Sequence, residues 1–286
     1  MESIPSAAPT RAQSSSSNPG SWAWPLGRPP TRGLRWPRPV DISRISRTRL
    51  LGRILRAPLS LIPKTAVVPV LQGPLTGKRW IVGAATHGAW LGTYEYRKQR
   101  LFARSIQPGM VVFDLGANVG FYTLVAAFST GPTGRVFAFE PVPRNVSFLR
   151  QHLQYNRAFN VEIVEAAVSE RVGVANFETA ESPSMGRLGP SGTLTIATVT
   201  LDDMVFGRGT PLPDVMKIDI EGGERAALEG ARHLLERRHP IIFLATHGWA
   251  VHSECCAFLR GLGYSLSGIH GESLDQTDEL IARFDV

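Results

Sequence analysis

Apolar runs of strand length alternate with helix-length segments over residues 110–262. Strands that alternate with helices of about 10 to 15 residues form parallel sheets, because each crossover helix packs back onto a face of the sheet. The alternation predicts an α/β fold with a doubly wound, mostly parallel sheet and helices on both faces. The expected strands are Met110–Leu115, Arg135–Glu140, Val161–Val168, Asp214–Ile220 and Ile241–Thr246, and the expected helices are Gly120–Phe128, Pro143–Tyr155, Ala226–Leu235 and His252–Leu262.

One stretch between Gly173 and Thr200 breaks this rhythm. Val174–Thr179 and Thr193–Thr200 predict an inserted β-hairpin around a loop rich in Pro, Gly and Ser. Ahead of the alternation, a strand is expected over Arg79–Ala85 and a helix over Tyr94–Ser105. We therefore expect three parts, namely a leader (1–66), a strand-and-helix extension (67–107) and the main domain (108–286).

The leader carries most of the chain's positive charge. Residues 1–60 contain ten arginines and two acidic residues, which gives this segment a charge of +8 and leaves the remaining residues at −1 of the chain's net +7. The leader's Ser, Pro, Gly and Arg content predicts disorder. Residues 42–57 could contact an anionic membrane as a basic amphipathic helix. Gly52 and Pro58 limit such a helix, so a solvated linker is favoured.

The cysteines and the hydropathy indicate the compartment. Cys255 and Cys256 are adjacent, and neighbours rarely satisfy disulfide geometry. A chain without a disulfide framework suits a reducing compartment. The sequence holds neither an apolar run long enough to span a membrane nor a secretory signal pattern. We expect a cytoplasmic protein, and the sequence does not indicate its oligomeric state.

The turn Asp114–Gly120 follows the first strand directly. Ligands of open α/β sheets bind beyond the carboxyl ends of the strands. Gly116 permits a tight turn and close approach of a ligand, and the following helix offers free N–H groups to a carboxylate. Asp114 could orient an ammonium group, directly or through water. The G-x-x-x-G spacing differs from the dinucleotide pattern G-x-G-x-x-G, which argues against an NAD-dependent oxidoreductase.

Two further positions suit a nucleoside. Glu140 ends the second strand, 24 residues after Gly116, and an acid there can accept hydrogen bonds from both ribose hydroxyls. The alternative is a surface acid at a strand end. Ala166 lies in the small-residue stretch Glu165–Val168, which could wall an adenine pocket or simply pack the sheet.

The later strands end in groups suited to acid–base chemistry. Asp219 and Glu221 follow the fourth strand, and carboxylates there can hold a substrate hydroxyl or act as a base. Glu221 and Glu224 could instead favour a helix N-terminus. His247 follows the next strand and could accept a proton from a hydroxyl, although a lone His is often structural. The sequence predicts no metal site.

Taken together, these residues resemble the FkbM family of methyltransferases. The resemblance covers about residues 67–284. It rests on Trp90–Glu95, Asp114–Tyr122, Phe139–Pro141, Glu165–Val168, Thr200–Asp203 and Lys217–Glu224.

The resemblance implies a class I methyltransferase fold, which is Rossmann-like with seven strands, the last one antiparallel. It implies S-adenosylmethionine as methyl donor and a hydroxyl acceptor on a sugar, glycolipid or secondary metabolite. By position, Glu140 would take the ribose, and Asp219 and Glu221 would face the reacting centre. The donor's methionine part would contact Asp114, Gly116, Asn118 and Gly120.

Two departures from the family pattern leave alternatives open. Gly223 stands where the family often has Ala, and Ala245 stands where it often has an acid two residues before the His. The identity of the base is therefore open between His247 and Asp219. A donor-binding protein without catalysis is one alternative, and an NAD-dependent oxidoreductase is a weaker one. Methylation of nucleic acid is disfavoured, because the near-neutral main domain offers no evident phosphate-binding face.

Overall fold

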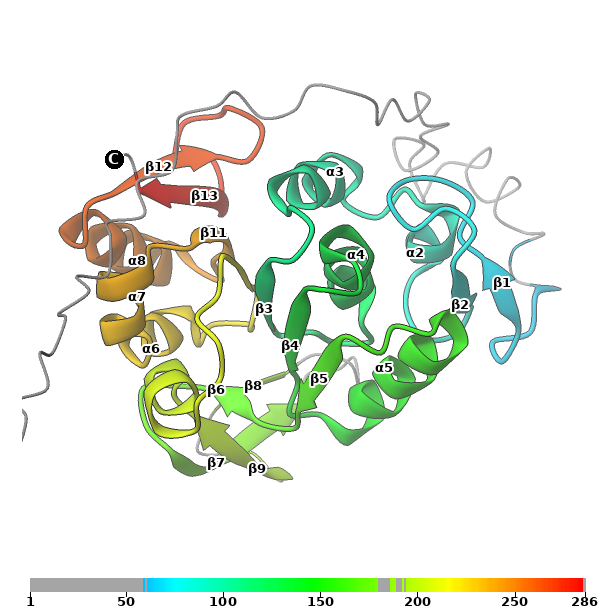
Figure 1. Ribbon diagram of the computed structural model, residues 1–286, viewed down its shortest axis with the longest axis horizontal. Coiled ribbons are helices and arrows are strands. Elements are labelled where there is room, and N and C mark those ends of the chain that lie inside the picture. The colour runs from blue at the N-terminus through cyan, green and yellow to red at the C-terminus, as the bar shows by residue number, and fades with distance from the viewer. Residues whose placement is uncertain (1–58, 60, 180–185, 189–191, 193, 285–286) are drawn as a thin grey trace, which may run out of the picture. The chain divides into compact units, whose positions relative to one another are not determined.

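The computed structural model describes Leu59 and residues 61–179, 186–188, 192 and 194–284. Its centre is a seven-stranded sheet in which β13 alone runs antiparallel to its neighbours (Figure 1). The predicted doubly wound fold with an antiparallel last strand is confirmed. In spatial order the strands are β12 (Tyr264–Gly268), β13 (Glu279–Phe284), β11 (Ile241–Ala245), β10 (Val215–Ile218), β3 (Val111–Leu115), β4 (Arg135–Phe139) and β5 (Val161–Val164).

Alternating strand residues feed two separate cores. Val112 and Val136 pack with α3 (Tyr96–Ser105), α4 (Phe121–Thr130) and α5 (Pro143–Asn156) on one face. Phe113 and Phe137 face the opposite way. They pack with α6 (Glu224–Glu229), α7 (Arg232–Arg238) and α8 (Trp249–Gly261), which lie together in Figure 1. Cys255 and Cys256 of α8 are buried as free thiols.

Two predicted elements are divided in the structure. The strand expected over Val161–Val168 ends at Val164, and β6 (Ala167–Val168) joins another sheet. The helix expected over Ala226–Leu235 is split into α6 and α7 at Gly230. A Cβ at Gly230 would lie 2.1 Å from the Ser169 carbonyl oxygen, so the chain passes too close there for any side chain.

The inserted hairpin is part of a larger unit. β7 (Gly173–Thr179) and β9 (Leu194–Val199) pair antiparallel as predicted. β8 (Gly186–Leu188) and β6 extend them to a four-stranded sheet of order β6-β9-β7-β8. A short π-helix (Asp203–Gly207) leads back to β10. This second sheet places Phe177 beside the main sheet's edge, in a small core with Val142.

The extension precedes the main sheet as β1 (Val67–Pro69), β2 (Arg79–Ile81), α2 (His87–Leu91) and α3. Ordered backbone also reaches into the segment assigned to the leader, because Gly83 and Val82 donate hydrogen bonds to Lys64 and Ala66. The amphipathic helix considered over residues 42–57 lies outside the described residues. Among the helices that are described, none has the length and apolar character needed to cross a bilayer.

The β3–α4 turn lies directly against the end of β10. The backbone N–H groups of Gly116 and Ala117 both donate to the Phe139 carbonyl at 3.0 Å. Gly116 has φ +73°, and a Cβ there would lie 2.0 Å from the Asp219 carbonyl oxygen. Glycine is needed at this position because two backbone segments meet, and this contact brings the ends of β3 and β10 together.

His152 fastens the extension to the main sheet. Its Nε2 accepts the Ile81 N–H at 3.1 Å, and its Nδ1 lies 2.7 Å from the Val119 carbonyl oxygen. The ring stacks on Trp80 with centroids 4.0 Å apart. Burial lowers the pKa of His152 from 6.5 to about 4. The folded protein therefore holds this imidazole neutral, with one nitrogen donating and the other accepting.

We predict that His152 makes stability depend on pH. Its folded pKa lies below its unfolded value, so its contribution is fully present above pH 6.5 and is lost as the pH falls toward 4. The free energy of unfolding should fall by roughly 3 kcal/mol across that window. Urea denaturation at several pH values measures this. His152→Gln should flatten the profile, whereas the same change at the exposed His233 should not. An unchanged slope in His152→Gln would contradict the assignment.

Candidate functional site

A cavity of about 530 Å³ opens where the carboxyl ends of the main strands meet the extension. Its walls come from the β3–α4 turn, the ends of β4, β10 and β11, the second sheet and the segment between β2 and α3. A volume of this size is typical of small-molecule sites. The cavity lies at the position where the strand order of an open α/β sheet predicts a ligand.

Most of the predicted site residues meet in this cavity. Its wall includes Gly116, Asn118, Glu140 and Ala166, together with the three predicted catalytic residues Asp219, Glu221 and His247. Asp114 and Gly120 lie behind the wall. The left-handed Gly120 begins α4, and a Cβ there would lie 2.5 Å from the Leu149 side chain, so packing against α5 accounts for the glycine.

Asp114 is fully buried and does not reach the cavity. Its Oδ2 accepts the Thr123 hydroxyl at 2.6 Å, and its Oδ1 lies 3.3 Å from the Lys217 ammonium. Asp114 and Lys217 are register partners on β3 and β10. Asp114 is therefore separated from the cavity by Lys217, and its predicted role toward a ligand ammonium, directly or through water, stays a prediction.

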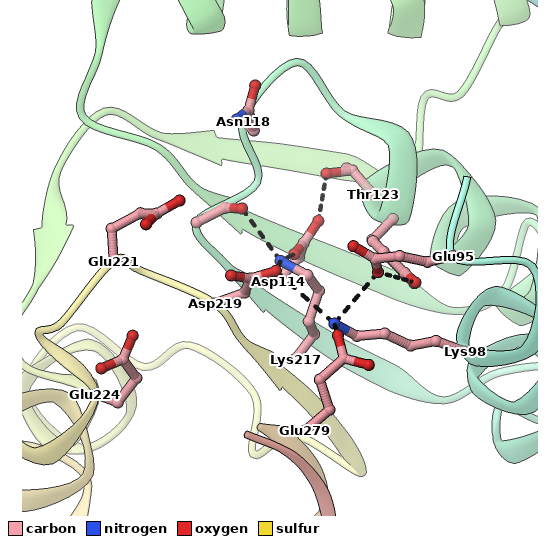
Figure 2. A network of polar contacts seen from close by, with 12 residues as sticks. Glu95, Lys98, Asp114, Asn118, Thr123, Lys217, Asp219, Glu221, Glu224 and Glu279 are labelled. Carbon is pink, nitrogen blue, oxygen red and sulfur yellow. Dashed lines mark hydrogen bonds and ion pairs between the residues drawn. The ribbon is translucent and has the colours of Figure 1, made fainter. Parts of the chain in front are cut away.

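Lys217 belongs to a network of two buried lysines and four carboxylates (Figure 2). Its ammonium donates to the Gly116 carbonyl at 3.2 Å and lies 3.7 Å from Asp219. Lys98, from α3, donates to Glu279 of β13 at 2.5 Å and lies 3.2 Å from Glu95 and 3.9 Å from Asp219. The network joins the extension, the β3–α4 turn, β10 and β13 around one end of the cavity.

Glu140 fixes the turn as well as facing the cavity. Its Oε2 accepts the Asn118 N–H at 2.8 Å, and its Oε1 accepts the Val142 N–H at 3.0 Å and the Asn145 amide at 3.1 Å. Burial raises the pKa of Glu140, although these hydrogen bonds oppose the shift. A carboxylate accepts about four hydrogen bonds, so roughly one position is left for a ribose hydroxyl, fewer than predicted.

His247 and three carboxylates form the other end of the site. The Nδ1 of His247 lies 2.7 Å from Glu224, and its Nε2 lies 3.4 Å from Glu221 and 3.8 Å from Asp219. Glu221 adopts the left-handed φ of +58°, which turns the chain there. The imidazole is about one third exposed, so a ligand in the cavity can reach it.

The two candidate bases differ in basicity. Burial would raise the pKa of Asp219, but Lys217, Lys98 and His247 lower it overall. For His247, the hydrogen bond to Glu224 raises the pKa, burial opposes it, and Glu221 and Asp219 add to the rise. A carboxylate held ionised by two lysines is a weak base, whereas an imidazole that titrates above its ordinary pKa is an effective one near neutral pH.

The charge of the wall identifies the kind of ligand that fits. One lysine, one histidine and six acidic residues line the cavity, and the acids are Glu95, Glu140, Asp219, Glu221, Asp278 and Glu279. S-adenosylmethionine carries a sulfonium and an ammonium against one carboxylate, so its net positive charge suits this wall. The apolar pocket of Val142, Ala166, Val168 and Phe177 suits an adenine. A pyrophosphate would add two negative charges to an acidic wall, so NAD fits poorly.

Five charged residues of the site had no predicted site role, namely Glu95, Lys98, Lys217, Glu224 and Glu279. Lys217 had a usable signal, a lone charge within the apolar strand Val215–Ile218. Glu224 was considered only as a helix-start residue. Lys98 and Glu279 had no usable signal, because they are 181 residues apart and meet only through the fold.

Comparisons with known proteins find that this chain is similar to methyltransferases. The family model described as "Methyltransferase FkbM domain" matches residues 114–266. Hexuronic acid methyltransferase AglP of Haloferax volcanii is 29% identical over 146 residues, covering 50% of this chain and 59% of that protein. 31-O-demethyl-FK506 methyltransferase FkbM of Streptomyces tacrolimicus is 27% identical over 196 residues, covering 56% of this chain and 75% of that protein.

Among solved structures, methyltransferase FkbM from Methylobacillus flagellatus KT aligns over 70% of this chain and 56% of that one, with 18% identity and a TM-score of 0.46. The chain thus spans little more than half the length of AglP and of this structure. The family model covers more than half of the chain, and it includes the β3–α4 turn, Glu140 and the His247 end of the cavity. The chain belongs to the FkbM family of S-adenosylmethionine-dependent methyltransferases.

Proposed function

We propose that this chain transfers the methyl group of S-adenosylmethionine to a hydroxyl oxygen of a small molecule or glycan. The observation that carries the proposal is the position of His247. Its Nε2 lies beside Asp219 and Glu221 at one end of a cavity whose wall also includes Gly116 and Glu140.

Different residues along the cavity have different roles in this proposal. Gly116, Asn118 and Glu140 would hold the methionine and ribose parts of the donor, and Ala166 would wall the adenine. When bound, S-adenosylmethionine supplies a methyl group already activated on a sulfonium. The protein's task is to orient the acceptor and remove its hydroxyl proton, and we assign the proton to Nε2 of His247.

Asp219 has a different role in this proposal. Its carboxylate lies within 4 Å of Lys98, Lys217 and His247, each of which favours its ionised form. Asp219 would stay ionised in the cavity wall, and its negative charge would stabilise the imidazolium formed when His247 takes the proton. Glu221, from the same segment, faces Nε2 as well and would help to place the acceptor hydroxyl.

The acidic wall also bears on the acceptor. The relatives are named for a hexuronic acid and for 31-O-demethyl-FK506, which are chemically unlike. An acceptor carboxylate would be repelled by the carboxylates that line this cavity. We therefore favour a neutral hydroxyl compound.

Contact with a membrane through residues 42–57 stays a prediction, as does the division of the chain at residues 67 and 108.

The donor is tested by isothermal titration calorimetry with S-adenosylmethionine and, separately, with NAD. We expect heat of binding from S-adenosylmethionine and none from NAD, because S-adenosylmethionine has a net positive charge that suits the acidic wall, whereas the pyrophosphate gives NAD a net negative charge. Binding of NAD without binding of S-adenosylmethionine would contradict the proposal and restore the oxidoreductase alternative.

The base is tested with His247→Asn and Asp219→Asn. In single-turnover assays we expect His247→Asn to slow methyl transfer about 100- to 10,000-fold with little change in the Kd of S-adenosylmethionine. Asp219→Asn should weaken donor binding and stability instead, because it removes counter-charge from Lys98 and Lys217. Undiminished transfer by His247→Asn would remove it from the base role. Donor binding by the unmodified chain with no transfer to any acceptor would favour the non-catalytic alternative.

The acceptor's charge is tested with a matched pair, methyl glucoside and methyl glucuronide, which differ by one carboxylate. We expect a higher kcat/KM for the neutral glycoside, and the difference should shrink as ionic strength rises because salt screens the repulsion. A preference for the glucuronide would place a cationic acceptor site outside the wall described above.

A further inference from the structure

Glu224 is an unusual residue for the first turn of a helix. It lies at the start of α6 yet is fully buried. Its Oε1 accepts the Gly222 N–H at 2.9 Å and faces the Nδ1 of His247 at 2.7 Å. Its Oε2 is buried and finds no hydrogen-bond partner among the described residues. A carboxylate kept only to cap a helix would be solvated, so burial of this one calls for another explanation.

We infer that Glu224 is a positioning residue for the proposed reaction: it fixes the tautomer of His247 and compensates the charge that the imidazole acquires. The inference rests on His247 being the base. An ionised carboxylate only accepts hydrogen bonds, so Nδ1 of His247 carries a proton, and in the neutral imidazole Nε2 then keeps its lone pair. That lone pair is on the side of the ring where Glu221 and Asp219 lie.

The surroundings of His247 are consistent with this division of roles. From the segment after β10, Asp219 and Glu221 face Nε2 at 3.8 Å and 3.4 Å, too far for strong hydrogen bonds and near enough to stabilise positive charge. From α6, Glu224 alone faces Nδ1. From α8, the Nδ1 of His252 lies 2.9 Å from the Thr246 hydroxyl, so His252 contacts Thr246 and not Glu224.

The arrangement also addresses the departure at Ala245. This chain has no acid two residues before the histidine, and Ala245 lines the cavity as a small apolar residue. The carboxylate that holds the imidazole comes instead from the neighbouring helix, 23 residues earlier in the chain. A base oriented by a buried carboxylate follows the same logic as other His–carboxylate pairs, in which the acid orients the ring and does not itself take the proton.

The test is Glu224→Gln, which keeps the shape and an oxygen for Nδ1 but removes the charge. We expect kcat to fall about 10- to 100-fold, a part of what a general base contributes, with the Kd of S-adenosylmethionine within twofold of the parent. Glu224→Asp should recover part of the rate. Glu229→Gln, on the same helix but paired with Arg225 and Arg232, is the matched control and should change neither value.

A second readout does not depend on turnover. The Glu224 carboxylate raises the pKa of His247, so Glu224→Gln should lower it, as followed by NMR titration of the histidine ring with His247→Asn for assignment. In the same variant the acidic limb of the kcat/KM profile should move to lower pH, because His247 would then lose its proton at a lower pH. If the pKa falls but no methyl transfer exists to be measured, the proposed function fails while the positioning of His247 stands. An unchanged pKa, or a rate loss matched by loss of donor binding, would overturn the inference.

Discussion

The ion pair between Lys217 and Asp114 is the contact on which the site depends. The two side chains are register partners on adjacent central strands, and both are almost fully buried. Removing one partner of such a pair leaves an uncompensated buried charge, which typically costs about 3–5 kcal/mol. Lys217 also holds the Gly116 carbonyl. One ammonium thus sets the position of the β3–α4 turn relative to the end of β10.

The cavity has two chemically distinct ends, one at the lysine–carboxylate network near the β3–α4 turn and one at His247. Two lysines among four carboxylates leave the network near the turn with excess negative charge, which suits a cation. At the end of β11, an imidazole sits among three further carboxylate contacts and has the basicity that Asp219 lacks. Asp219 belongs to both groups, so the two ends of the cavity are linked through one carboxylate.

The parts of this molecule that follow local rules were predictable. Strand–helix alternation led to the doubly wound sheet, and the strand ends led to Gly116, Glu140, Asp219 and His247. The position of Asp114 at a strand end did not reveal that its side chain is buried, because alternation along β3 points it toward α4 and Thr123. The break at Gly230 and the meeting of Lys98 with Glu279 depend on contacts between distant segments, which no local pattern encodes.

The distance along the chain between Lys98 and Glu279 has a consequence for biosynthesis. A ribosome releases α3 long before β13, and β13 then inserts between β11 and β12. Until that insertion, Lys98 lacks the nearest of its counter-charges, and one wall of the cavity is missing. Pairings of such long range form slowly. The cavity wall that Asp278 and Glu279 supply therefore depends on a segment made long after the β3–α4 turn, and the cavity is complete only once β13 has paired with β11.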